Sequence, residues 1–243
     1  MWASRAEDLS GRAGRNRGRL TLVLAFALFS ATSAASAQTT VVQPTQKLAA
    51  LLSTHEAFSK PSRRSTPLRV VQARRPLTGE RTVLPVLGET KDWVRVRLPG
   101  RPNGRSGWIV RRGTLASTTR WHIVIDVTTR RVIVYRSGRV VRTVKAVVGK
   151  PSTPTTRGQF FVEEAIQLRA TDVGAPFALA LSARSEVLQE FDGGPGQIAL
   201  HGLDNVGGIP GTAVSHGCVR LANAMMRWLV LRIGPGVPVT VIR

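Results

Sequence analysis

The segment Ser215-His216-Gly217-Cys218-Val219-Arg220-Leu221 holds the one cysteine of a 243-residue chain. Most free cysteines are small buried hydrophobes, but such a cysteine needs apolar neighbours, and this one is set among serine, histidine, glycine and arginine. A single cysteine allows no internal disulfide, which leaves intermolecular pairing or a reactive thiol. The segment therefore predicts a working thiol at Cys218.

Three neighbouring features would help Cys218 to react. A thiol attacks as its thiolate, and His201 and His216 are each candidates for the base or the imidazolium partner. A helix expected from Asn223 to Ile233 would lower the pKa of the thiol through its N-terminal amides. Gly217 exposes backbone, so the amides of Gly217 and Cys218 are candidates for an oxyanion hole.

A metal site is the alternative use of the same side chains. His201, His216 and Cys218 would furnish three ligands, but no fourth ligand has the usual spacing, and His-Gly-Cys is not a common zinc spacing. We therefore predict no metal.

The first 37 residues have the pattern of a secretory signal. Four arginines between Arg12 and Arg19 precede the apolar run 20–29, and small residues lead to Ala37. The run is short of the roughly 20 residues that span a bilayer, so we predict cleavage, export to the cell envelope, and membrane attachment only if the signal stays uncleaved.

The whole chain carries a formal charge of +21, and about +18 without the signal. Such a charge favours anionic partners, and for an exported protein these are cell-envelope polymers. No nucleic-acid-binding motif occurs, so we predict no nucleic-acid partner. Genome composition that favours arginine would give the same charge without any partner, and the sequence does not indicate an oligomeric state.

Composition and periodicity divide the remaining chain into three parts. Residues 38–65 are predicted to be a linker with a short helix around Lys47 to Phe58, and residues 66–117 contain short strands and turns typical of a small β-barrel. Residues 120–243 begin with a strand-rich antiparallel meander and end with the helix after Cys218 and a strand from Val237 to Ile242. The predicted fold class is mainly β.

Two families resemble parts of this chain. The run from Asp92 to Arg97, with the later 105–109, resembles bacterial SH3-like domains and covers residues 66–117 only. The pair His201-Gly202, followed after twelve residues by the Cys218 segment, resembles the signature of L,D-transpeptidases with the YkuD-type catalytic domain over residues 120–243. A departure lies at Thr155-Thr156-Arg157-Gly158, where that family often has Thr-Pro-x-Gly, and we expected it to touch no catalytic position.

The second resemblance implies roles for the residues of the segment. Cys218 would be the nucleophile and His201 the general base, with the carbonyl of Gly202 orienting the imidazole. Ser215 and His216 would support the site. Arg220 would hold the carboxylate of the substrate or order the loop, and a structural salt bridge is an equal alternative for it.

The resemblance also implies a reaction. The substrate would be the peptidoglycan stem peptide, cut between the L-centre of a diamino acid and D-alanine, with an acyl-thioester on Cys218. Transfer to the amine of another stem gives a 3→3 cross-link, and water or a free D-amino acid would give hydrolysis or exchange. Two-step acyl transfer needs no cofactor. The competing hypothesis is a noncatalytic envelope-binding protein.

Overall fold

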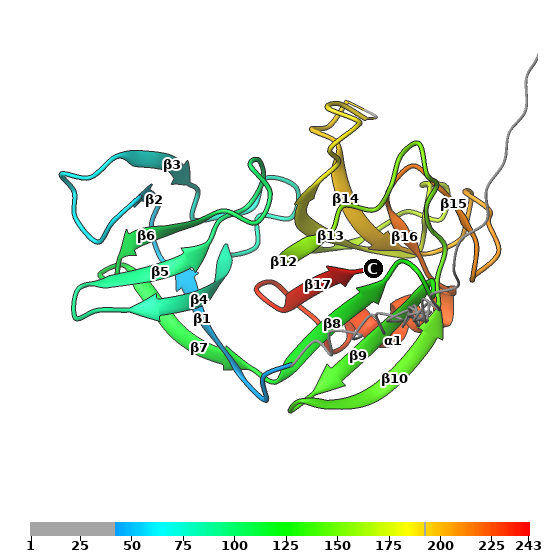
Figure 1. The fold of residues 1–243 in the computed structure, drawn as a ribbon, viewed down its shortest axis with the longest axis horizontal. Helices are drawn as coiled ribbons and strands as arrows, with labels where there is room; N and C mark the ends of the chain where they lie inside the picture. Colours follow the sequence, from blue (N-terminus) through cyan, green and yellow to red (C-terminus); the bar gives the residue numbers. More distant parts are fainter. Residues whose placement is uncertain (1–41, 192) are drawn as a thin grey trace, which may run out of the picture. The chain divides into compact units, whose positions relative to one another are not determined.

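A computed structural model describes residues 42–191 and 193–243. The predicted signal, residues 1–37, lies outside the described residues. Within the described part, no helix is both long and apolar enough to cross a membrane. The described residues form one compact unit (Figure 1).

The N-terminal part of this unit is a seven-stranded sheet with the order β3-β2-β6-β5-β4-β1-β7. Its aliphatic side chains alternate along the strands and enclose a core that includes Leu51, Leu84, Val96 and Ile109, all fully buried. Its strands are β1 (Gln46–Leu51), β2 (His55–Phe58), β3 (Pro67–Val71), β4 (Val83–Glu89), β5 (Trp93–Arg97), β6 (Ser106–Val110) and β7 (Thr114–Thr119).

The predicted linker with a helix from Lys47 to Phe58 is wrong at these residues. The run from Lys47 to Leu51 is rich in alanine and leucine, which favour helices. Strand β1 nevertheless pairs with both β4 and β7, and its apolar side chains are buried in the core. Pairing with distant strands overrides such local propensity. His55, in the same segment, is buried, and its ring nitrogens contact the carbonyl oxygens of Ser53 (2.7 Å) and Arg112 (3.1 Å). The SH3-like resemblance of this part stays a prediction.

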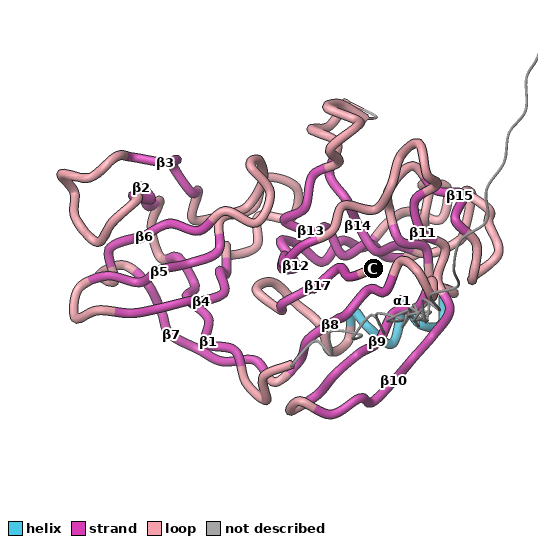
Figure 2. The backbone as a smooth tube through the Cα atoms, viewed as in Figure 1, coloured by secondary structure: helices cyan, strands magenta, loops and turns pink. Residues whose placement is uncertain are grey.

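The C-terminal part is built on an eight-stranded sheet with the order β10-β9-β8-β17-β12-β13-β14-β16 (Figures 1 and 2). The predicted meander is confirmed as three antiparallel strands, β8, β9 and β10. The strands are β8 (Trp121–Asp126), β9 (Arg131–Arg136), β10 (Arg139–Lys145), β12 (Gly158–Gln167), β13 (Phe177–Arg184), β14 (Gln197–His201), β16 (Val219–Arg220) and β17 (Pro238–Ile242). Two short strands, β11 (Val148–Gly149) and β15 (Ala213–Ser215), pair in parallel beside this sheet.

A helix covers the end of the sheet that carries the Cys218 segment. Helix α1 (Asn223–Val230) buries Met225, Met226 and Leu229, packs on β13 and β14, and is the one α-helix in the described residues. β13 is buried along almost its whole length because helix and loops cover one face and the core fills the other. The mainly β fold class with one short helix after the nucleophile is therefore confirmed.

Candidate active site

Two strands that are adjacent in space hold the predicted nucleophile and base. β14 and β16 pair in parallel, with Leu200 opposite Val219 and His201 opposite Arg220. Leu200 and Val219 are fully buried in the core. Because side chains alternate across a sheet, the side chains of His201, Arg220 and Cys218 project to the other face.

That face opens into a cavity of about 360 Å³. His201, Cys218 and Arg220 line it from the strands, and His216 lines it from the segment before the nucleophile. Other walls come from the loop between β13 and β14 and from the loop after β14; they include Leu188, Phe191, Asn205 and Val206. The fold thus brings into one cavity four residues that the sequence singled out.

Hydrogen bonding assigns the tautomer of His201. Nδ1 lies 2.8 Å from the carbonyl oxygen of Gly202, and since a carbonyl only accepts, Nδ1 carries the proton. Nε2 of the neutral ring then has a free lone pair that can accept a proton. Burial lowers the pKa of His201, the Gly202 carbonyl opposes this shift, and the charge of Arg220 adds to it. The imidazole is therefore neutral at neutral pH and has the form of a general base.

The thiol of Cys218 is partly buried, and burial raises its pKa. The backbone of Ala199 and the charge of Arg220 oppose the shift without overcoming it. The predicted lowering of this pKa by the helix is therefore wrong. The desolvation of the thiolate outweighs the favourable charge of Arg220, so the thiol form is favoured.

The backbone around the nucleophile is fixed by hydroxyl groups. The buried Ser215 Oγ donates to the carbonyl of Cys218 (2.6 Å) and accepts from the amide of Gly217 (3.1 Å). The Gly217 amide is thus occupied, so its predicted role in an oxyanion hole is not supported by this arrangement, and the amide of Cys218 is the remaining candidate. Gly217 has a φ of +121°, and a Cβ there would lie 3.0 Å from Ile198.

Thr155, which precedes the departure from the family pattern at Thr156, contacts the Cys218 segment, whereas Thr156 Oγ1 itself donates to the carbonyl of Arg184 (3.0 Å). The buried Thr155 Oγ1 donates to the carbonyl of Gly217 (2.8 Å) and accepts from the amide of Gly149 (2.9 Å). Thr153 Oγ1 donates to the carbonyl of Ser215 (3.2 Å). The departure from the family pattern therefore lies one residue from a threonine that holds the nucleophile loop.

Two glycines allow close packing around His201, one against its ring and one against the neighbouring backbone. A Cβ on Gly174 would lie 2.4 Å from His201 Nδ1, and a Cβ on Gly202 would lie 2.0 Å from the carbonyl oxygen of Ala175. Asn223, the first residue of α1, accepts from the amide of Leu203 (2.9 Å) through Oδ1 and so fastens the chain that follows the base. Sequence reasoning missed Gly174 and Asn223 because each acts through a residue distant in the chain.

Arg220 and His216 differ in burial. Arg220 is 9 % exposed, and its Nη1 donates to the carbonyls of Val206 (3.3 Å) and Gly207 (3.1 Å). It orders the loop after β14, and among the described residues it forms no salt bridge. His216 is exposed and stacks on Phe191 with ring centroids 5.9 Å apart. Within the described residues no group of three or more His, Cys, Asp or Glu side chains is arranged for a metal ion.

Comparisons with known proteins agree on one family for this part of the chain. The family model of the YkuD-type L,D-transpeptidase catalytic domain matches residues 120–241. A protein of Bacillus subtilis named as a putative L,D-transpeptidase YkuD is 29% identical over 126 residues, which are 52% of this chain and 68% of that protein. Its namesake in Bacillus licheniformis is 31% identical over 106 residues, which are 44% of this chain and 56% of that protein.

Solved structures resemble the chain more distantly. An L,D-transpeptidase from Mycobacterium smegmatis is 20% identical with a TM-score of 0.38, covering 62% of this chain and 90% of its own. L,D-transpeptidase 3 from Mycobacterium tuberculosis, solved with a faropenem-derived adduct, is 15% identical with a TM-score of 0.42, covering 63% and 92%. The match to the family model carries the assignment.

Proposed function

The chain belongs to the YkuD family of L,D-transpeptidase catalytic domains, and from that premise we propose that it is a peptidoglycan L,D-transpeptidase with Cys218 as nucleophile and His201 as general base. The observation that carries the proposal is the pairing of β14 with β16, because it gives His201 and Cys218 the same face and the same cavity. The raised pKa of Cys218 and the lowered pKa of His201 support proton transfer during attack over a preformed ion pair.

The first half-reaction follows from these protonation states. His201 Nε2 takes the thiol proton while Cys218 Sγ attacks the carbonyl carbon of the L-diamino acid in a tetrapeptide stem. The bond between that carbon and the nitrogen of D-alanine breaks, and the imidazolium returns the proton to the leaving amine. An acyl-thioester on Cys218 remains, and the amide of Cys218 faces the developing oxyanion.

In the second half-reaction an amine of another stem attacks the thioester. The amine loses a proton to His201, a new amide forms, and the Cys218 thiol is regenerated by that proton. The product is a 3→3 cross-link. Water in place of the amine gives L,D-carboxypeptidase activity, and a free D-amino acid gives exchange at the same site.

The expected setting of this reaction is the cell envelope. The signal-like pattern of residues 1–37 supports export, and the charge of about +18 on the rest supports contact with anionic envelope polymers. That charge also favours the second candidate, a noncatalytic envelope-binding protein, which would bind cell walls without forming an acyl-enzyme.

Mass spectrometry of the purified protein with disaccharide-tetrapeptide separates these functions. We expect a dimer, released D-alanine and an acyl adduct on Cys218 with the unchanged chain, and none of these with Cys218→Ala or His201→Ala. His216→Ala is the matched control, since His216 lines the same cavity but stacks on Phe191. Full activity of Cys218→Ala would refute the assignment, and inactivity of His216→Ala with activity of His201→Ala would transfer the base role to His216.

A further inference from the structure

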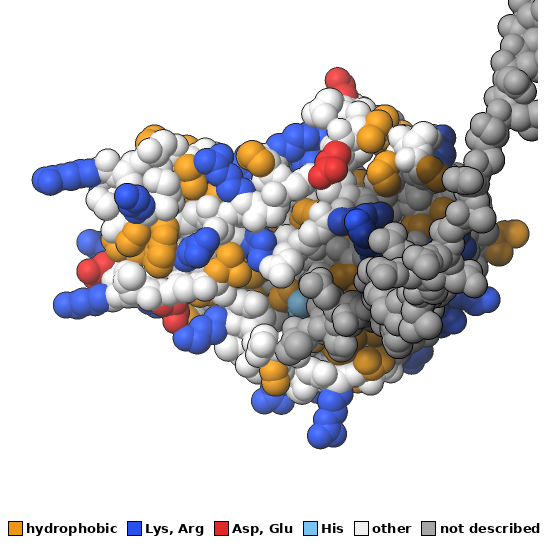
Figure 3. Space-filling model, in the orientation of Figure 1, with side chains coloured by type: hydrophobic (Ala, Val, Ile, Leu, Met, Phe, Trp, Pro, Cys, Tyr) orange, Lys and Arg blue, Asp and Glu red, His pale blue; other side chains and the backbone are white. Residues whose placement is uncertain are grey.

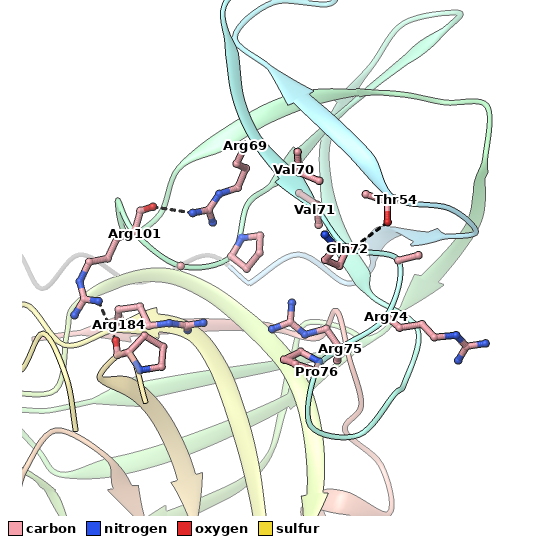
Figure 4. Close-up of a pocket in the computed structure, with 14 residues that line it drawn as sticks. Thr54, Arg69, Val70, Val71, Gln72, Arg74, Arg75, Pro76, Arg101 and Arg184 are labelled. Carbon is pink, nitrogen blue, oxygen red and sulfur yellow. Dashed lines mark hydrogen bonds between the residues drawn. The ribbon is translucent and has the colours of Figure 1, made fainter. Parts of the chain in front are cut away.

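A second cavity, larger than the catalytic one, is lined by arginines. Its volume is about 790 Å³, and five of its fourteen lining residues are Arg69, Arg74, Arg75, Arg101 and Arg184. No aspartate, glutamate or aromatic residue lines it. Figure 4 shows the guanidinium groups of Arg69, Arg75 and Arg184 approaching the hollow from different elements. We call this cavity the arginine groove.

Two of the five arginines are neutralised by buried carboxylates behind the groove. Glu163 is fully buried and pairs with Arg75 and with Arg184, and Arg75 also lies 3.6 Å from Glu164. The Arg75 pairs join the segment between β3 and β4 to β12, and the Arg184 pair joins β13 to β12. Arg75 and Arg184 therefore stabilise the fold, and Arg69, Arg74 and Arg101 are the groove arginines outside these ion pairs.

These three arginines have no carboxylate partner among the described residues. Arg69 donates to the carbonyl of Arg101 (3.1 Å), and Arg74 donates to that of Gly79 (2.8 Å). Carbonyl groups satisfy hydrogen bonds without cancelling charge. Burial lowers the pKa of Arg69, and repulsion from Arg184 lowers it further; burial likewise lowers the pKa of Arg184 to about 10. The groove therefore has an excess of positive charge that an anion would relieve.

The arginine groove and the catalytic cavity share a wall. Arg101 donates to the carbonyls of Ser185 (2.7 Å), Leu188 (3.2 Å) and Pro195 (2.9 Å). Ser185 and Leu188 also line the catalytic cavity, whereas Pro195 lines the groove. An extended ligand in the groove therefore runs past the loop that borders Cys218. Figure 3 shows Lys and Arg spread over the visible face, and the groove adds a concave site to this general charge.

We propose that the arginine groove binds carboxylates on neighbouring stems of the peptidoglycan chain whose own stem occupies the catalytic cavity. This inference rests on the proposed function for the identity of the polymer. Guanidinium groups match carboxylates with paired hydrogen bonds, and the absence of aromatic lining residues argues against recognition by stacking on sugar rings. The groove would select polymeric wall over free muropeptide.

The test measures binding apart from chemistry. In the full chain with Cys218→Ala, the double substitution Arg69→Gln with Arg74→Gln removes two groove charges without touching the Glu163 pairs. The matched control, Arg131→Gln with Arg139→Gln, removes two exposed charges from β9 and β10. The probe is soluble peptidoglycan chains with tetrapeptide stems, used both native and with the stem carboxylates amidated, and poly(glycerol phosphate) is the phosphate-bearing comparison.

We expect the groove variant to raise Kd for native chains about ten-fold, equivalent to about 1.4 kcal/mol, and the control to raise it less than about three-fold. Amidated chains should bind the parent protein as weakly as native chains bind the groove variant. The proposal would be overturned if both double variants lost the same affinity for native chains, or if amidated chains bound the parent protein as tightly as native chains. It would also be overturned if poly(glycerol phosphate) bound the parent more tightly than native chains and lost affinity in the groove variant but not in the control. If Arg69→Gln lowers the melting temperature, the exposed Arg74→Gln alone must still weaken binding more than Arg139→Gln alone.

A separate assay tells failure of this inference from failure of the proposed function. With Cys218 present, the groove variant should be acylated by disaccharide-tetrapeptide within about two-fold of the parent rate, because a monomer does not reach the groove. Absence of acylation in the parent would refute the proposed function whatever the binding result. Acylation without groove-dependent binding would refute only the groove.

Discussion

Gly174 offers a way to displace the proposed base without removing it. A Cβ at this position would lie 2.4 Å from His201 Nδ1 and 2.8 Å from Cγ, whereas ordinary contact begins near 3.4 Å. The ring or the loop must therefore move by about 1 Å, which would lengthen the bond from Nδ1 to the Gly202 carbonyl. Misplacement of a catalytic group by about 1 Å can cost about 100-fold in rate.

Gly174→Ala also strains the backbone, and this loss of stability has to be separated from the displacement of His201. Its φ is +84°, and a non-glycine residue in that region costs about 1–2 kcal/mol. Gly79→Ala is the matched control, since its φ is +69° and a Cβ there would meet nothing within 4 Å. Both variants should lose about 1–2 kcal/mol in urea unfolding from strain alone.

The assay compares acylation of Cys218 by disaccharide-tetrapeptide in the two variants, followed by mass spectrometry. We expect Gly174→Ala to react about 100-fold more slowly and Gly79→Ala to react within about two-fold of the unchanged protein. Rates that agree within about three-fold between the two variants would show that the position of His201 does not control the reaction.

Three further results are expected. Because burial raises the pKa of Cys218 above its ordinary value of 9.0, alkylation by iodoacetamide should still be rising with pH at pH 9, and a plateau by pH 7 would contradict the raised pKa. Ser215→Ala removes two hydrogen bonds of a buried hydroxyl and should cost about 1–3 kcal/mol in urea unfolding, with slower acylation; Ser117→Ala, on the exposed edge strand β7, is the control. Glu163→Gln leaves two arginines without their buried carboxylate partner and should lower the free energy of unfolding, measured in urea, by about 3–5 kcal/mol. Glu89→Gln, at an exposed ion pair, should lower it by less than about 1 kcal/mol.

Local patterns predicted the elements whose pairing partners follow directly in the chain. The meander from Trp121 to Lys145 alternates, has short turns and was found as expected, and the helix from Asn223 follows its apolar spacing. Strand β1 was missed because its residues favour a helix locally and become a strand only through β4 and β7. Its partner β7 begins 63 residues after the end of β1, too far for any local signal.

In the site, too, local sequence predicts some features, and contacts with distant residues determine the others. The Cys218 segment is contiguous, so a reactive thiol could be predicted from its residue types. The pKa of Cys218 could not be predicted, since it depends on burial in a cavity whose walls include the distant residues Leu188, Phe191 and Val206. Likewise, the occupation of the Gly217 amide by Ser215 depends on a turn geometry that spacing does not specify.

The position of β17 has a consequence for biogenesis. This strand, Pro238–Ile242, lies in the middle of the eight-stranded sheet, pairing with β8 on one side and β12 on the other. Until β17 has been synthesised, β8 and β12 each have an unpaired edge, because β17 is the strand that lies between them. A nonsense mutation that deletes β17 would therefore remove the link between the two halves of the sheet rather than trim an edge.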